Sequence, residues 1–321
     1  MTEDNSNTDQ LEFLHPILDR SFGREEEIAI NSKMVQATDS ASCCIPESYA
    51  HLFPVRASGT RLPLFGIYPG TPGSRDIVDF LPPDQPIYDF YFSEFDPAVD
   101  FPTVERLAEL YLKDLRKVQE HGPYQLCGYS SGGLVAYEMA RLLLGQGEKV
   151  SFLALFDTWH PQFTQNMPKR ELVLYRLLRF VDRLRKYGRI LLQGRLNDLV
   201  AGAAEFAWKR IRSVGMRVLR KFFRTAKRPS SKPMQVIGSL ESYTPKPLAK
   251  RFIVIRPDDP VDKKLKDQTV GWRACAKEGV DVHFIRTEHG RMVLNPFAHT
   301  LANKIAPYLA HAPRQQDGSR A

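Results

Sequence analysis

Apolar and polar positions along this chain change their spacing in a way that predicts alternating strands and helices. Short apolar runs stand at 86–92, 124–129 and 150–156, and runs of this length are typical of buried strands. Between them, residues 104–115 and 133–144 repeat apolar side chains at the spacing of a helix with one buried face. Strands that alternate with helices in this way indicate a mainly parallel sheet flanked by helices.

The same alternation resumes in the last third of the chain, from about residue 235. Strands are expected at 251–256 and 280–286, and a helix is expected over 296–309. The two halves of the pattern therefore belong to one sheet, with a differently composed segment between them.

Length and composition fit a single domain with an insertion. A chain of 321 residues, 43% of them hydrophobic, can bury a full α/β core. Residues 1–48 and 313–321 are polar and poorly periodic, so we expect them to be tails. The sequence predicts an α/β domain over residues 49–312, with a helical insertion at about 161–234.

The insertion carries much of the formal net charge of +8. Its apolar residues recur at helical spacing: Leu174, Leu177, Leu178, Val181 and Leu184, then Val214, Val218 and Phe222. Few acidic residues stand between them, whereas basic residues are frequent, among them Arg176, Arg179, Arg183, Arg185, Lys186, Arg217, Arg220 and Lys221. Such a surface attracts acidic partners, although a solvated face without any partner would have the same composition.

A glycine-flanked serine joins the strand expected at 124–129 to the helix after it. The segment from Gly128 to Gly132 has the pattern G-x-S-x-G of a nucleophile elbow, a sharp turn that exposes the central Ser130 at a helix N-terminus. The glycines remove Cβ atoms that would collide with the neighbouring strand and helix. The competing interpretation is an ordinary surface turn. Ser131 is the rival nucleophile, but no glycine stands two positions before it.

A serine hydroxyl is a weak nucleophile at neutral pH, so it needs a base, and the base needs a carboxylate to hold its tautomer. Asp157 is the first candidate acid because it directly follows the strand expected at 150–156, and parallel sheets bind ligands at that end of their strands. It could instead cap the next turn. Asp258 and Asp259, after the strand expected at 251–256, are the alternative acid.

The candidate base is His289. It lies in a loop between the strand expected at 280–286 and the C-terminal helix, so the three residues follow the chain order Ser, Asp, His of α/β-hydrolases. The other histidines are better interpreted as satisfied or solvent-facing side chains: His121, His160, His283 and His299.

Together these features resemble the thioesterase domains that end polyketide synthases and nonribosomal peptide synthetases, which have the α/β-hydrolase fold. The resemblance covers roughly residues 50–312 and rests on the segments 62–70, 122–133, 155–159 and 271–272, and on His289 before a C-terminal helix. Tyr68 is a departure, because the family often has histidine before the proline there. The resemblance favours Asp157 over Asp258, since the family usually places its acid after the strand that follows the elbow helix.

The resemblance also implies an oxyanion hole, a pair of N–H groups that stabilise the negative oxygen of a tetrahedral intermediate. One donor would be the backbone N–H of Ser131, at the positive end of the helix dipole. The second would come from the loop 69–73, first from Thr71, with Gly70 next in line. A loop dense in Gly and Pro at the end of a strand can present such an N–H group, and the competing interpretation is a plain surface turn.

The activity that the resemblance implies is that of a thioesterase. The enzyme would release an acyl chain, polyketide or peptide, from the phosphopantetheine of a carrier protein through an acyl-serine intermediate, by hydrolysis or cyclisation. It would itself bind no cofactor and no metal. The same triad would also serve an acyltransferase or a carboxylester hydrolase, and a degenerate hydrolase fold could act as a non-catalytic binding protein.

The insertion stands where the family places a helical lid over its active site. A basic lid would suit an acidic acyl- or peptidyl-carrier protein. An anionic membrane surface is the alternative, because a basic amphipathic helix can lie on it. Nucleic acid is the weaker interpretation, since the insertion has no recognisable reading module and few aromatic side chains for base stacking.

The remaining features indicate a cytoplasmic protein. The first ten residues are polar and acidic, and no apolar run approaches the ~18 residues of a membrane helix. Cys43 and Cys44 are adjacent, while Cys127 and Cys275 are isolated, which is not a disulfide framework and fits a reducing compartment. No carrier region accompanies the domain, so we expect a free-standing enzyme or a fragment of a larger synthase.

Overall fold

The structure is a computed structural model that describes residues 51–69, 73–90, 103–192 and 242–309. Both expected tails lie outside these ranges, and so do residues 193–241, which make up much of the expected insertion.

A seven-stranded sheet with the order β1-β3-β2-β4-β5-β6-β7 occupies the described residues. The strands are β1 (Leu52–Arg56), β2 (Leu64–Ile67), β3 (Ile87–Phe90), β4 (Tyr124–Tyr129), β5 (Val150–Phe156), β6 (Phe252–Pro257) and β7 (Val280–Ile285). Among these described strands, only β1 runs antiparallel to its neighbour, β3. The predicted, mainly parallel sheet is confirmed. Because its parallel strands share one direction, the carboxyl ends of β2, β4, β5, β6 and β7 meet at one edge.

The described α-helices are α4 (Val104–Val118), α5 (Ser131–Gly145), α6 (Lys169–Leu192) and α9 (Ala298–Leu309). Short 3₁₀ turns join them: η1 (Gly73–Asp76), η2 (Val78–Phe80), η3 (Asp262–Lys264), η4 (Trp272–Cys275) and η5 (His289–Arg291). The side chain of Thr103 caps α4 by accepting a hydrogen bond from the N–H of Arg106 at 3.3 Å, so the helix begins where the apolar periodicity begins.

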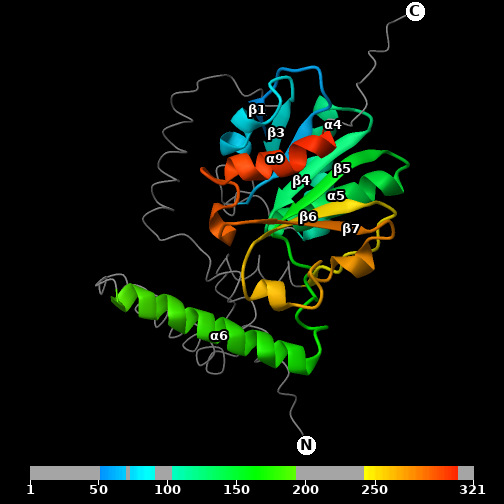
Figure 1. Ribbon diagram of the computed structural model, residues 1–321. Coiled ribbons are helices and arrows are strands. Elements are labelled where there is room, and N and C mark those ends of the chain that lie inside the picture. The colour runs from blue at the N-terminus through cyan, green and yellow to red at the C-terminus, as the bar shows by residue number, and fades with distance from the viewer. Residues whose placement is uncertain (1–50, 70–72, 91–102, 193–241, 310–321) are drawn as a thin grey trace, which may run out of the picture. The chain divides into compact units, whose positions relative to one another are not determined.

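Helices cover both faces of the sheet (Figure 1). On one face, Leu301 and Ile305 of α9 join Cys127, Ala154 and Ile255 of the central strands in one buried apolar cluster. On the other face, α4 and α5 pack against each other and α5 contacts the central strands. The sheet edge that carries the strand ends is left for the loops.

The chain divides into two compact units. The first, Met1–Asn166 and Pro233–Ala321, contains the sheet, and the second is Met167–Lys232. α6 is the described helix of the second unit, and it carries the apolar residues that the sequence placed at helical spacing between 174 and 184. One apolar face of α6 is more than half exposed: Val173, Leu174, Leu177, Phe180 and Leu184. Among the described helices, none has both the length and the apolar character that a membrane span needs.

Candidate active site

Ser130 occupies a strained turn between β4 and α5. Its backbone has φ 53° and ψ −123°, a region that residues with a Cβ rarely enter and that costs of order 1–3 kcal/mol. The strain is held by the surrounding structure, because the N–H of Ser130 donates to the carbonyl of Phe156 in β5 at 2.8 Å. The serine therefore stands at the edge of the sheet where the parallel strands end.

Glycines around the serine make this turn sterically possible. A Cβ on Gly128 would lie 2.4 Å from the carbonyl oxygen of Gly132, and one on Gly132 would lie 2.3 Å from the carbonyl oxygen of Ile67. A Cβ on Gly133 would come within 1.9 Å of the Thr158 hydroxyl. The structure thus confirms the predicted reason for the glycines, namely close approach to the helix and the neighbouring strand.

Ser131 is the first residue of α5. The first N–H groups of a helix have no partner within the helix and carry the positive end of its dipole, so the N–H of Ser131 has the chemistry of an oxyanion donor. The other candidate donors, Gly70 and Thr71, lie outside the described residues.

Asp157 follows β5 directly and is only 4% exposed. Its φ is 43°, and its N–H donates to the carbonyl of Ile255 in β6 at 2.7 Å. Because Tyr129 pairs with Phe156 across β4 and β5, Ser130 and Asp157 leave adjacent strands side by side. A buried carboxylate is in this way brought to the nucleophile candidate from 27 residues along the chain.

The alternative acids have structural roles of their own. The carboxylate of Asp258 forms an ion pair with Lys263. That of Asp259 accepts hydrogen bonds from the N–H groups of Val261 at 2.8 Å and Asp262 at 3.0 Å, so it caps the turn after β6. These contacts favour Asp157 as the acid.

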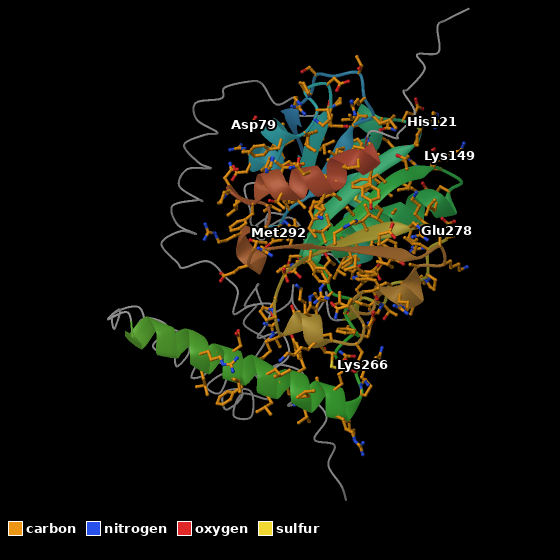
Figure 2. All side chains as sticks on the ribbon, viewed as in Figure 1. Asp79, His121, Lys149, Lys266, Glu278 and Met292 are labelled. Carbon is orange, nitrogen blue, oxygen red and sulfur yellow. The ribbon has the colours of Figure 1, made fainter. Side chains whose placement is uncertain are left out.

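His289 begins η5 after β7, and β7 is separated from β5 only by β6. Its backbone lies beyond the end of β7, and the structure does not describe its side chain. Met292, which follows η5 and is labelled in Figure 2, is fully buried. This buried side chain anchors the segment that carries the candidate base to the core.

The other histidines considered from the sequence have different partners. His121 contacts Glu148 at 3.2 Å and lies with Lys149 near the starts of β4 and β5, away from the strand ends (Figure 2). The remaining contacts are those of His160 with the Cys275 thiol at 3.4 Å, His283 with the Tyr308 hydroxyl at 2.9 Å, and His299 with the Asn303 amide at 3.0 Å. Burial also lowers the pKa of His160.

A hydrogen-bonded support around the candidate acid was not found from the sequence. The Thr158 hydroxyl donates to the carbonyl of Ser130 at 2.9 Å, and the indole N–H of Trp272 donates to the carbonyl of Thr158 at 2.8 Å. Gly271, which directly precedes this tryptophan and has φ 92°, packs closely against His160, because a Cβ there would lie 2.8 Å from the Cβ of His160. The Gly271-Trp272 pair was noticed as a motif, but its contact with Thr158, 114 positions away, leaves no local signal.

A buried cation lies at the end of β6. Arg256 is fully buried, donates to the carbonyl of Gln268 at 3.0 Å and lies 3.5 Å from the carboxylate of Asp262. Its guanidinium stands over the ring of Trp159 at 5.5 Å. A charge this deep is held by its partners, so these contacts brace the loop that follows Asp157.

Known proteins match this chain in sequence. The model of the Thioesterase domain family matches residues 96–305. Malpibaldin synthetase of Mortierella alpina is 39% identical over 116 residues, which are 35% of this chain and 2% of that protein. An atromentin synthetase of Tapinella panuoides is 32% identical over 113 residues, 34% of this chain and 12% of that protein. The chain therefore spans only a small part of the length of these relatives. An inactive atromentin synthetase of Paxillus involutus also matches, at 29% identity over 114 residues, 35% of this chain and 12% of that protein.

Solved structures show the same fold at low sequence identity. A four-domain nonribosomal peptide synthetase bound to AMP and glycine has a TM-score of 0.54 at 18% identity, over 85% of this chain and 21% of that one. The NocB thioesterase domain has a TM-score of 0.50 at 20% identity, over 81% of this chain and 99% of that one. The fold is that of the α/β-hydrolases, as predicted.

Proposed function

Because the chain belongs to the thioesterase domain family, we propose that it releases an acyl chain, polyketide or peptide, from the phosphopantetheine arm of a carrier protein through an ester of Ser130. One observation carries the proposal. Ser130 is held at φ 53° on a turn between a central strand and a helix, beside the buried Asp157, which is the geometry that exposes a nucleophile to a substrate.

In the first half of the reaction, the hydroxyl oxygen of Ser130 attacks the thioester carbonyl carbon while its proton passes to His289. Asp157 orients the imidazole and stabilises the imidazolium that forms. The tetrahedral intermediate then collapses and the carbon–sulfur bond breaks. The thiolate of pantetheine takes the proton from His289 and leaves, and the acyl chain remains on Ser130 as an ester.

The negative oxygen of the intermediate needs donors that are in place before the reaction. The N–H of Ser131 supplies one at the start of α5, and the N–H of Thr71, or of Gly70, supplies the other. Loss of one such donor typically costs about 10²- to 10³-fold in rate.

In the second half, His289 removes a proton from the group that attacks the ester. If this group is water, the product is a free acid and the reaction is hydrolysis. If it is a hydroxyl or amine of the acyl chain itself, the product is a ring. In both cases the proton returns to the oxygen of Ser130 as the ester bond breaks.

The carrier protein is proposed to be acidic and to approach the basic second unit. α6 alone carries Lys169, Arg170, Arg176, Arg179, Arg183, Arg185, Lys186 and Arg189 against Glu171 and Asp182. Opposite charges steer association and lose their effect as salt screens them. Turnover of carrier-bound substrate should therefore exceed that of free acyl-pantetheine at low salt, and the advantage should shrink as salt rises. If carrier-bound substrate has no such advantage, the steering proposal is wrong.

The test of the nucleophile compares Ser130→Ala with Ser131→Ala on acyl-pantetheine thioesters. Ser130→Ala should lower turnover roughly 10³- to 10⁶-fold, whereas Ser131→Ala keeps the backbone N–H and should keep most of the activity. Intact-mass spectrometry should detect an acyl adduct on the wild type and none on Ser130→Ala. Near-normal activity of Ser130→Ala would refute the proposal.

Assays on the same protein distinguish three competing functions. Faster turnover of oxygen esters than of thioesters would indicate a carboxylester hydrolase, and transfer to added alcohols or amines in preference to water would indicate an acyltransferase. A fluorophosphonate probe that fails to label Ser130 would favour a binding protein without catalysis.

A further inference from the structure

A buried carboxylate holds the residue that directly follows the candidate oxyanion loop, defined here as residues 69–73, of which the structure describes the two ends. Asp89, in β3, is fully buried. One of its carboxylate oxygens accepts a hydrogen bond from the N–H of Ser74 at 2.6 Å, and the other accepts one from the hydroxyl of Ser74 at 2.7 Å. Both oxygens are thus directed at one residue of η1.

Keeping an ionisable group at this position is costly for the fold. Burial raises the pKa of Asp89 to about 7, although the bonds from Ser74 and the charge of Arg75 act in the opposite direction. The other titratable groups that face it are the Tyr68 hydroxyl at the end of β2 and the Cys127 thiol in β4. An apolar side chain would fill this core position without the desolvation cost. We therefore attribute the presence of the carboxylate to the two hydrogen bonds that it accepts from Ser74.

What Asp89 holds is one end of the oxyanion loop. Ser74 directly follows the loop, and Tyr68 directly precedes it, with its N–H bonded to the carbonyl of Phe90 at 3.3 Å. Both ends are therefore fixed to β3. Gly66 makes the approach possible, because a Cβ there would lie 2.2 Å from the ring of Tyr68 and 2.8 Å from the carboxylate of Asp89.

A second contact ties the same turn to the segment after the candidate base. The carboxylate of Asp76, the last residue of η1, accepts a hydrogen bond from the N–H of Asn295 at 2.8 Å. Asn295 closely follows η5 and the buried Met292 and Val293. η1 therefore lies between the strand that carries Asp89 and the segment that follows His289.

We propose that Asp89 is a positioning residue for catalysis: through Ser74 it fixes the start of η1, the described turn that directly follows the candidate oxyanion donors in the chain. The proposal rests on the function proposed above. Asp76 adds a weaker restraint from the other side, because its bond is exposed to water. Since an oxyanion donor acts mainly in the transition state, loss of the restraint should lower kcat more than it raises KM.

The test compares Asp89→Ala and Asp89→Asn with Asp114→Ala. Asp114 is a buried carboxylate in α4, paired with Lys117 and contacting His51, so Asp114→Ala is a control for the loss of a buried acid elsewhere. Asp89→Asn keeps the shape, and its amide can accept from the N–H of Ser74 and donate to the Ser74 hydroxyl. We expect Asp89→Ala to lower kcat about 10- to 100-fold with KM changed less than about threefold, Asp89→Asn to restore kcat to within about fivefold of the wild type, and Asp114→Ala to stay within about threefold.

A second measurement separates positioning from simple loss of structure. A peptidyl boronic acid forms a tetrahedral adduct with the serine and places a negative oxygen in the oxyanion hole. Its inhibition constant should rise by about the same factor as kcat falls in Asp89→Ala, while KM stays near the wild-type value. Kinetics are measured at a temperature where circular dichroism shows each variant folded.

The outcomes are distinguishable. If Asp89→Ala has the kcat of Asp114→Ala, or loses activity only in proportion to unfolded protein, Asp89 is a structural residue and the inference is wrong. If Asp89→Ala does not fold, Ser74→Ala replaces it, because this change removes one of the two bonds, and an unchanged kcat would again overturn the inference. Failure of the proposed function would be seen separately, as retained activity in Ser130→Ala.

Discussion

The hydroxyl of Thr158 donates a hydrogen bond to the carbonyl oxygen of Ser130 at 2.9 Å. This bond joins the loop that carries Asp157 to the turn that carries the candidate nucleophile. The same hydroxyl occupies the space that a Cβ on Gly133 would need, so the elbow and the acid loop fit together at one point. The relative position of the candidate nucleophile and the candidate acid therefore depends on a residue that has no proposed part in the reaction itself.

Replacing this threonine should disturb catalysis while the fold survives. Thr158→Val keeps the shape but removes a net hydrogen bond worth about 1 kcal/mol and leaves the carbonyl of Ser130 without this donor, so kcat should fall roughly threefold to tenfold. Thr158→Ser keeps the hydroxyl and serves as the control. Steady-state kinetics on an acyl-pantetheine thioester measure both. Equal kcat values for the two variants would show that the bond does not position the elbow.

A methyl group at the elbow should be far more damaging than one at the far end of the same helix. In Gly132→Ala the new Cβ would lie 2.3 Å from a backbone oxygen of β2 that cannot move aside, so we expect a loss of unfolding free energy of several kcal/mol and loss of activity. Gly145→Ala is the matched control, since no atom lies within 4 Å of the added Cβ, and it should stabilise α5 by about 0.5–1 kcal/mol. Urea unfolding measures both, and a stable, active Gly132→Ala would contradict the described elbow.

The identity of the acid can be tested with isosteric amides. Asp157→Asn should lower kcat about 10³- to 10⁴-fold, because an amide in this place favours the wrong imidazole tautomer. Asp258→Asn should change kcat less than about threefold, since its carboxylate is engaged with Lys263. A crippling Asp258→Asn together with a harmless Asp157→Asn would transfer the role to Asp258.

Asp89 should make the protein less stable as the pH rises from about 4 to about 7. The unfolded chain releases this proton near pH 4, whereas the raised pKa of the buried carboxyl, about 7, keeps it protonated in the folded state. The folded state binds more protons over this interval, so the unfolding free energy falls with rising pH. Below about pH 4 and above about pH 7, the protonation of Asp89 does not change the unfolding free energy with pH.

Comparison with Asp89→Asn isolates this contribution. The unfolding free energy of the variant minus that of the wild type should rise by a few kcal/mol between pH 4 and pH 7, because only the wild type loses stability over this interval. Tyr68 and Cys127 do not interfere, because burial raises the pKa of both groups, that of Cys127 to about 12. Urea titrations at pH 4.5, 6 and 7.5 measure the difference. A difference that does not change with pH would show that Asp89 is not held as a buried acid.

The order of strands and helices was predicted from the sequence because it depends on local periodicity. The expected strand at 150–156 is β5, and the expected helix over 104–115 is the greater part of α4. The sharp turn at Ser130 was also predicted from local sequence, because such a turn tolerates no side chains at the positions of the flanking glycines. The assignments of Ser130, Asp157 and His289 to the reaction stay predictions, and so do those of Ser131, Thr71 and Gly70 to the oxyanion hole.

The contacts around the candidate site could not be found in this way. Thr158 and Trp272 are 114 positions apart, and Ser74 and Asp89 are 15 apart. Neither pair leaves a periodic pattern, because each contact joins separate elements of the fold. The ion pair of Asp258 with Lys263, which argues against Asp258 as the acid, is visible only in the structure.

By itself, then, the sequence determined the α/β order of the elements and the strained serine between β4 and α5, because backbone sterics and hydrophobic spacing act over a few neighbouring residues. Only the tertiary structure decided which side chains support that serine: Thr158, Trp272 and the pair of Asp89 with Ser74. The physical reason is that a buried hydrogen bond is worth forming only where packing removes water from both partners, and packing brings together residues that are far apart in the chain.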